Sequence, residues 1–333
     1  MHPEDMERAL AAAIAAADEV HGTTSPNPPV GAAILSADGE LVGVGGTQPP
    51  GGPHAEVVAL TIAGAAARGG TAVVTLEPCN HTGRTGPCSH ALADAGIATV
   101  RYVNPDPNPE ATGGAQYLAQ RGVDVARIEA RTRALEAWLA ATRLGRPHVT
   151  LKFAQSLDGF TAAVDGSSQW ITGEAARADV HRDRLTRDAI IIGTGTALAD
   201  DPSLTARPGV GGDVAAQRQP RRVVIGTRDV SASAGNLVRL GYEQYPSLTE
   251  GLAALWETGA RDVLIEGGAS LAASAIEAGL VDAVRAYIAP VILGDGRGVL
   301  HGWSASTLVN APRFELGDVT TFGVDVLLEM RRT

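Results

Sequence analysis

The stretch HAEVVALTIAGAAARGGTAVVTLEPCNHTGRTGPC, residues 54–88, decides the fold of the first half of the chain. Its alanine-rich beginning predicts a helix over residues 55–67, and the apolar run TAVVTL predicts a strand over residues 71–76. A second helix is expected from Pro87 to Asp94, because proline is favoured in the first turn of a helix. Helices that alternate with strands in this way are typical of an α/β layer fold.

The residues before and after this stretch extend the same pattern. Residues 4–20 are rich in alanine and begin with acidic side chains, which predicts a helix. Two apolar runs meet at Asp38-Gly39, and an Asp-Gly pair between such runs is a strong signal for a β-hairpin. A strand over 97–103 and a helical stretch near 129–143 complete a first domain.

The pattern starts again after the Gly-Arg-Pro sequence at residues 145–147, so we expect two α/β domains, residues 1–145 and 146–333. The expected elements of the second domain are strands at 149–154, 188–192, 221–226, 261–266 and 283–292, and helices at 174–186, 249–258 and 269–278. Residues 207–220 are rich in Gly, Gln and Pro and predict a surface loop. The apolar C-terminal run VDVLLEM fits either a core strand or an interface.

Composition limits the class of protein. The chain has 333 residues, 44% of them apolar, a formal charge of −10 and scattered basic residues, which does not favour binding to a nucleic-acid backbone. Two cysteines cannot form a disulfide framework and fit a reducing cytoplasm. The N-terminal segment, residues 1–20, is acidic at its start and amphipathic, unlike a signal sequence, and no run approaches the roughly 18 apolar residues of a membrane span. We therefore expect a cytoplasmic protein that binds neither nucleic acid nor membrane.

Both cysteines lie in the opening stretch, where they form a candidate zinc site with His54. A catalytic zinc takes three protein ligands and keeps a fourth position for water, and His54, Cys79 and Cys88 supply that number. Glu56 lies two residues from His54 and can reach the same cavity without binding the metal. Zinc-dependent base deaminases use a non-ligand glutamate in this way, as the general acid and base. Eight residues separate the two cysteines here, where the usual signature has two.

Other interpretations of this cluster stay open at the level of residues. The two cysteines could be buried apolar side chains, or the zinc could be structural with His81 or His90 as a fourth ligand. Glu56 favours a catalytic site.

Two glycine-containing segments are candidates for a dinucleotide site. Gly193 and Gly195 follow an apolar strand, but Leu198 stands where a Rossmann motif requires the third glycine. Gly267-Gly268 lies between a strand and a helix, where backbone can approach a pyrophosphate and the helix amides can bind it. Taken alone, this second segment also fits an ordinary tight turn.

Motifs along essentially the whole chain resemble the family of bifunctional riboflavin-biosynthesis deaminase–reductases. The motifs are NPPVGA (27–32), HAEV (54–57), TLEPCNHTGRTGPC (75–88), DPNP (106–109), LKFAQSLDGFTA (151–162), GSSQWIT (166–172), GTGTALADDPSLTAR (193–207) and IEGGASLAAS (265–274). The resemblance implies a three-layer α/β/α domain like that of cytidine deaminases, followed by an α/β domain like dihydrofolate reductase.

The resemblance also implies two reactions on one pyrimidine. The first is zinc-dependent hydrolysis of the 2-amino group of 2,5-diamino-6-(5-phosphoribosylamino)pyrimidin-4(3H)-one. The second is NADPH-dependent reduction of the ribosyl group to ribityl. Members of the family form homodimers or higher homo-oligomers, which is what we expect here.

The site residues that the resemblance implies fall into four groups. The metal ligands are His54, Cys79 and Cys88, with Glu56 as the catalytic residue. The deaminase substrate would contact Asn27, His81, Arg84, Asp106 and Asn108. The NADPH contacts would be Ala154, Trp170, Thr196, Asp200, Thr227, Gly268, Ala269, Ser270, Leu271, Ala272, Ala273 and Ser274. The reductase substrate would contact Ser168, Arg184, Leu204, Arg207 and Glu266.

Two further assignments come from charge and position. Arg184 and Arg207 suit a ribose phosphate, although the charged sequence RADVHRDRLTRD around Arg184 also fits a solvated helix face. Arg228, just past a strand, could face the 2′-phosphate of NADPH. Lys152 lies on the first strand of the second domain, without an assigned role.

A second hypothesis keeps the zinc deaminase but gives it a nucleoside or tRNA substrate and an unrelated C-terminal binding module. A tRNA enzyme requires a basic face, which a chain of net charge −10 lacks. A third hypothesis is a structural zinc in a non-enzymatic interaction protein.

Overall fold

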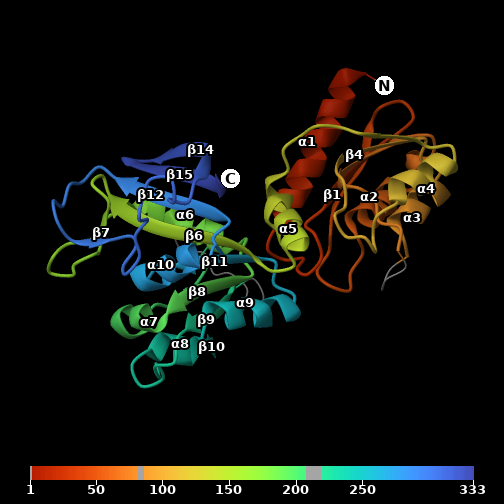
Figure 1. Ribbon diagram of the computed structural model, residues 1–333. Coiled ribbons are helices and arrows are strands. Elements are labelled where there is room, and N and C mark those ends of the chain that lie inside the picture. The colour runs from red at the N-terminus through yellow and green to blue at the C-terminus, as the bar shows by residue number, and fades with distance from the viewer. Residues whose placement is uncertain (1, 82–85, 208–218) are drawn as a thin grey trace. The chain divides into compact units, whose positions relative to one another are not determined.

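The computed structural model describes residues 2–81, 86–207 and 219–333 (Figure 1). The chain divides into two compact units, Met1–Gly145 and Arg146–Thr333. Each unit is built around its own sheet, as expected for an α/β protein. Among the described residues, no helix combines the length and apolar character that a bilayer crossing requires.

The first unit contains a five-stranded sheet in the order β2-β1-β3-β4-β5. The strands are β1 (Gly31–Leu35), β2 (Leu41–Gly46), β3 (Thr71–Leu76), β4 (Thr99–Asn104) and β5 (Asp124–Arg127). Strand β1 pairs antiparallel with β2 and β3, whereas β3, β4 and β5 are parallel. The helices are α1 (Pro3–Val20), α2 (Ala55–Ala63), the 3₁₀ helix η1 (Gly64–Ala67), α3 (Cys88–Asp94), α4 (Gly114–Gln120) and α5 (Arg133–Leu144).

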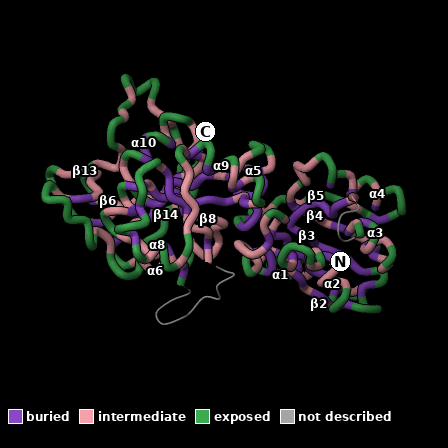
Figure 2. The backbone as a smooth tube through the Cα atoms, turned by 90° about the horizontal axis from the view of Figure 1, so that it is seen from below, coloured by how far each residue is buried: buried purple, intermediate pink, exposed green. Residues whose placement is uncertain are grey.

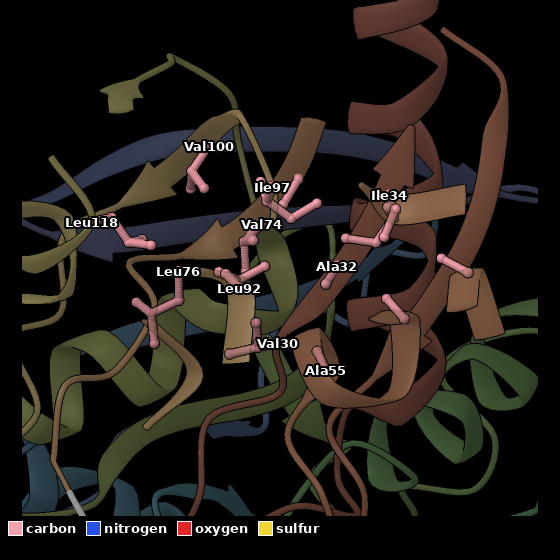
Figure 3. Packing of buried hydrophobic residues seen from close by; sticks show 14 of the residues in the cluster. Val30, Ala32, Ile34, Ala55, Val74, Leu76, Leu92, Ile97, Val100 and Leu118 are labelled. Carbon is pink, nitrogen blue, oxygen red and sulfur yellow. The ribbon is translucent and has the colours of Figure 1, made fainter. Parts of the chain in front are cut away.

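The alternation of strand β1 gives the first unit its layers. Ala32 and Ile34 belong to the cluster that α2, α3 and α4 cover, part of which Figure 3 shows. Ala33 and Leu35 pack instead with α1 on the opposite face. Helix α1 lies close to strand β1 because the strand begins with a residue that has no side chain. A Cβ on Gly31 would lie 1.9 Å from the carbonyl oxygen of Ala13 in α1. The result is the expected three-layer arrangement.

The second unit contains an eight-stranded sheet in the order β10-β9-β8-β11-β6-β12-β15-β14 and a two-stranded sheet of β13 and β7. The strands are β6 (His148–Ser156), β7 (Phe160–Ala162), β8 (Ala189–Gly193), β9 (Arg221–Ile225), β10 (Glu243–Tyr245), β11 (Asp262–Glu266), β12 (Ala283–Ala289), β13 (Arg297–Gly298), β14 (Phe314–Phe322) and β15 (Asp325–Arg332). The helices are α6 (Glu174–Arg184), α7 (Thr194–Asp200), α8 (Gly235–Leu240), α9 (Leu248–Glu257) and α10 (Ala269–Glu277).

Helices cover both faces of the large sheet. Ile191 and Val223 face a cluster with α9 and α10, while Ile190, Ile192 and Val224 face α7 and α8. The central strands are therefore buried on both sides, which Figure 2 shows for β8. The strands from β10 to β12 are parallel, and β15 and β14 are added antiparallel at one edge.

The structure confirms the expected α/β class and each helix and strand that the sequence predicted, with shifts at the ends. It adds short elements that were not predicted, among them α4, β5, α7, α8 and β10. The run VDVLLEM forms most of β15 inside the sheet, where Leu327 is buried. Of the predicted loop 207–220, residues 208–218 lie outside the described residues.

Candidate active sites

Three separate elements bring His54, Cys79 and Cys88 together. His54 is the N-cap residue of α2, Cys79 follows β3, and Cys88 is the first residue of α3. His54 Nδ1 lies 3.7 Å from Cys79 Sγ and 3.3 Å from Cys88 Sγ. The ligand atoms of the three residues all lie within 4.8 Å of one another, close enough to hold one metal ion. In the described part of the chain, no other group of three or more His, Cys, Asp or Glu residues meets this condition.

The distances fit a tetrahedral zinc site. With zinc–sulfur bonds of about 2.3 Å and zinc–nitrogen bonds of about 2.0–2.1 Å, neighbouring ligand atoms stand about 3.5–3.8 Å apart. The two nitrogen–sulfur distances, 3.7 and 3.3 Å, are close to this range. The three residues can therefore hold zinc with little movement.

The electrostatics of the two thiols also fit a cation. A hydrogen bond from the Cys88 thiol, helped by His54, lowers the pKa of Cys79 to about 4. The same hydrogen bond and burial raise the pKa of Cys88 above its ordinary value. Without a cation the pair thus carries one negative charge, and zinc supplies the positive charge that makes both thiolates favourable.

Glu56 lies in the first turn of α2 and is only 4% exposed. Burial, helped by the negative charge on Cys79, raises the pKa of Glu56 to about 7. A carboxyl group of this pKa is suited to accept and return a proton near neutral pH.

A cavity of about 200 Å³ opens beside this cluster. His54, Glu56 and Cys79 line it, and so do four of the residues expected to contact the deaminase substrate: Asn27, His81, Asp106 and Asn108. Arg84, the fifth, lies outside the described residues. Burial raises the pKa of Asp106, whose side chain accepts a hydrogen bond from the backbone N–H of Asn108 at 2.9 Å.

The two histidines considered as a fourth metal ligand, His81 and His90, lie outside the ligand group of the described residues. His81 lines the cavity, and His90 stacks on Tyr117 with ring centroids 4.1 Å apart. Neither belongs to the ligand group among the described residues, which favours a catalytic over a structural zinc.

The second unit has a larger cavity, of about 1090 Å³, at the carboxyl ends of its parallel strands. This edge is where open α/β sheets bind ligands. The predicted site residues that line it are Ala154, Ser168, Arg184, Thr196, Asp200, Leu204, Glu266, Gly268, Ala269, Ser270, Leu271, Ala272 and Ser274. Four predicted residues are not in its lining: Trp170, Arg207 and Thr227, which are exposed, and Ala273, which is buried in α10.

Arg184 and Glu266 form a buried pair at the floor of this cavity. Arg184 Nε donates to Glu266 Oε1 at 2.6 Å and Nη2 donates to Oε2 at 2.8 Å. Lys152 Nζ lies 3.2 Å from the same carboxylate. Two cations hold the pKa of Glu266 well below its usual range although burial opposes them. The solvated-face interpretation of Arg184 is wrong, since its side chain is only 13% exposed.

Some residues that line the cavities were not predicted as site residues. Thr194, Arg297 and His301 line the large cavity, and Glu77 and Trp138 line the small one. Glu77 lies inside the motif that contains Cys79, and Thr194 lies inside the motif over residues 193–207, which is the signal that could have identified them. The other three carry no local signal of this kind.

Comparisons with known proteins agree with this geometry. Residues 147–328 match the RibD C-terminal domain, and residues 3–104 match the cytidine and deoxycytidylate deaminase zinc-binding region. The chain is 58% identical over 312 residues to riboflavin biosynthesis protein RibD of Corynebacterium ammoniagenes, covering 92% of each protein. It is 37% identical to the RibD protein of Escherichia coli strain K12, covering 96% of this chain and 98% of that one.

Solved structures agree over the full length. RibD of Acinetobacter baumannii (form 1) superposes with a TM-score of 0.86 at 37% identity, covering 99% of both chains. A diaminohydroxyphosphoribosylaminopyrimidine deaminase/5-amino-6-(5-phosphoribosylamino)uracil reductase of Thermotoga maritima superposes with a TM-score of 0.87 at 30% identity, covering 100% of both chains.

Proposed function

The chain belongs to the RibD family of riboflavin-biosynthesis enzymes, which join a deaminase to a reductase, and on that premise we propose which residues carry each reaction. We assign the deaminase to residues 1–145 and the NADPH-dependent reductase to residues 146–333. Each of the two cavities is lined by residues of one unit alone, which supports this division.

In the deaminase, His54, Cys79 and Cys88 would hold one zinc ion. When bound, zinc acts as a Lewis acid that activates water at neutral pH. Glu56 takes a proton from the attacking water and passes it to the departing amino group, so that C2 gains oxygen and ammonia leaves. Its buried position and its pKa of about 7 suit both transfers.

The other residues of the small cavity would bind and orient the pyrimidine. Asn27 and Asn108 offer amide groups, and Asp106 offers a carboxyl group, for hydrogen bonds to the ring. The net charge of −10 disfavours the tRNA alternative, because a tRNA enzyme requires a basic face.

In the reductase, the nicotinamide and the opened ribosyl group would meet in the large cavity. NADPH, which Thr196, Asp200 and the segment that begins at Gly268 would hold, would supply a hydride to C1 of the imine form of the sugar, with a proton added at the adjacent nitrogen. The Arg184–Glu266–Lys152 cluster fixes the charge at the floor of the cavity. The main contribution of the protein would be to hold the hydride-bearing carbon of the nicotinamide and C1 of the sugar within reacting distance.

One observation carries the deaminase assignment: Glu56 and His54 share a cavity with Cys79, and Cys88 completes the ligand set. The test is an assay of both substrates on one preparation in which zinc is also quantified. We expect ammonia release from the diaminopyrimidine to follow zinc content, and NADPH oxidation with the deaminated compound to be independent of it. Deamination by fully active protein that holds no zinc would contradict the proposal.

We also propose that the protein is cytoplasmic, as its two free thiols suggest, and that it assembles as a homodimer or larger homo-oligomer. Sedimentation of the full-length chain tests the second statement, with a monomer at working concentration as the contrary result.

A further inference from the structure

The large cavity extends across the carboxyl ends of four neighbouring strands, β9, β8, β11 and β6. Neighbouring strands lie about 4.8 Å apart, so these four ends span about 14 Å. Arg228, beyond β9, lines one side, and Lys152 on β6 lines the other. Between them lies the Gly267-Gly268 turn before α10, the place where backbone can approach a pyrophosphate.

This order fixes the direction of a dinucleotide. If the pyrophosphate lies over Gly267-Gly268, one nucleoside extends toward β6 and the other toward β9. The nicotinamide must reach the substrate beside Lys152 and Glu266, on the β6 side. The adenosine, with its 2′ position, is therefore directed toward Arg228.

The protein holds the backbone of Arg228 in place. Gln244 Nε2 donates to the carbonyl oxygen of Gly226 at 2.7 Å and to that of Arg228 at 2.9 Å. Gly226 has φ of +127°, and a Cβ there would lie 2.9 Å from Thr194 Oγ1. Only glycine fits this close approach without movement, and it brings the turn against the start of α7.

One nitrogen of the Arg228 guanidinium, Nε, makes a hydrogen bond within the protein, and the two terminal nitrogens remain as donors. Its Nε donates to Thr194 Oγ1 at 3.2 Å. Nη2 lies over Gly195, 3.3 Å from where a Cβ would stand. Among the described residues, no carboxylate pairs with Arg228 and no hydrogen bond from its terminal nitrogens is found. Such a group can donate two parallel hydrogen bonds to a phosphate.

The other two arginines in the cavity lining have acidic neighbours. Arg184 is paired with Glu266, and the charge of Arg297 acts on the carboxyl group of Asp200. Of the three arginines that line the large cavity, Arg228 is therefore the best placed to bind a phosphate group near the end of β9.

We propose that Arg228 binds the 2′-phosphate of NADPH and so gives the reductase its preference for NADPH over NADH. This inference rests on the proposed reductase function. NADH carries a hydroxyl group at the same position, and nucleotide sites that accept the phosphate place an arginine there, whereas those that select the hydroxyl place a carboxylate.

The test measures binding without turnover. The full-length protein and Arg228→Gln are titrated by calorimetry with adenosine 2′,5′-bisphosphate and with 5′-AMP, which differ at the 2′ position. We expect Arg228→Gln to weaken the bisphosphate by about 10- to 100-fold and to leave 5′-AMP unchanged, because the lost hydrogen bonds are to a charged group. Arg228→Lys should restore part of the difference.

Matched variants separate this role from a general loss of charge. Arg239→Gln removes the same charge from the exposed end of α8 and should bind both nucleotides like the unchanged protein. The inference would be overturned if Arg228→Gln and the unchanged protein bound the bisphosphate with equal affinity. It would also be overturned if Arg297→Gln, and not Arg228→Gln, lost affinity for the bisphosphate. If the unchanged protein bound neither nucleotide, the NADPH assignment would fail and the role of Arg228 with it.

Discussion

Arg184 and Glu266, 82 positions apart in the sequence, form a two-pronged ion pair at the end of β11, with contacts of 2.6 and 2.8 Å. Arg184 is the last residue of α6, so the pair joins that helix to the edge of the sheet where the large cavity opens. Both charged groups are buried, and Lys152 adds a second cation.

Replacing Glu266 by Gln should impair the reductase and destabilise its unit, because Arg184 and Lys152 would keep buried charges without a counter-charge. We expect a loss of about 3–5 kcal/mol in the free energy of unfolding of this unit. Chemical denaturation followed by tryptophan fluorescence measures it. The control is Glu243→Gln, which breaks the half-exposed pair with Arg221 and should cost less than about 1 kcal/mol. Equal costs for both variants would show that burial is not the cause.

Replacing Glu56 by Gln should reduce ammonia release by about 10²- to 10⁴-fold, since the amide cannot transfer protons. Zinc content should be unchanged because Glu56 is outside the ligand group, and NADPH oxidation with the deaminated substrate should persist. Glu40→Gln, in the exposed turn after β1, is the matched control. A parallel loss of both activities would argue against two independent sites.

Removing zinc with a chelator should abolish deamination and spare reduction, and added zinc should restore the first. The unchanged protein should contain about one zinc ion per chain, and Cys79→Ser or Cys88→Ser should contain less, because each supplies one of three ligands. Elemental analysis with both assays measures this. Deamination that survives complete removal of zinc would be the contrary result.

Replacing Gly114 by Ala should weaken zinc retention from a distance. A Cβ on Gly114 would lie 1.7 Å from the carbonyl oxygen of Pro78, so Pro78 and the adjoining Cys79 must move. We expect faster zinc loss to a chelator. Gly86→Ala, two residues before Cys88, is the control, because a Cβ there meets nothing within 4 Å. Equal rates of zinc loss in the two variants would contradict this explanation.

The ionised side chain of Asp158 should stabilise the folded protein, and this contribution should be lost at acid pH. Its side chain accepts hydrogen bonds from Ser156 Oγ and from the backbone N–H groups of Leu293 and Gly294, and these lower its pKa to about 2. Because the folded pKa lies below the unfolded value, the contribution is complete above about pH 5 and is lost as the pH falls toward 2. The difference in thermal midpoint between the unchanged protein and Asp158→Asn should narrow over that range. A difference in thermal midpoint that stays constant from pH 5 to pH 2 would contradict this role of Asp158.

The sequence predicted best the elements whose signals are local. The hairpin at Asp38-Gly39 was predictable because its turn residues and its apolar runs agree. The helix expected over 55–67 ends its regular part at Ala63, and its last turn is 3₁₀, a detail that composition does not encode. Helix α7 was missed because Gly193 and Gly195 favour a turn, while packing of Ala197 against the sheet stabilises a helix.

The candidate zinc site was predictable because its residues lie in one stretch with a known chemistry. The charge pairs of the reductase cavity were not. The sequence around Arg184 resembles a solvated helix face, and its counter-ion lies on a strand that comes much later in the chain. Only the fold brings Glu266 to Arg184, as it brings Arg228 to Thr194.

Each cavity is walled by residues from a single unit, and this has a genetic consequence. A chain damaged at Glu56 still carries an intact reduction site, and a chain damaged at Glu266 still carries an intact deamination site. Two such alleles expressed in one cell should complement each other, since the product of one chain can diffuse to the other.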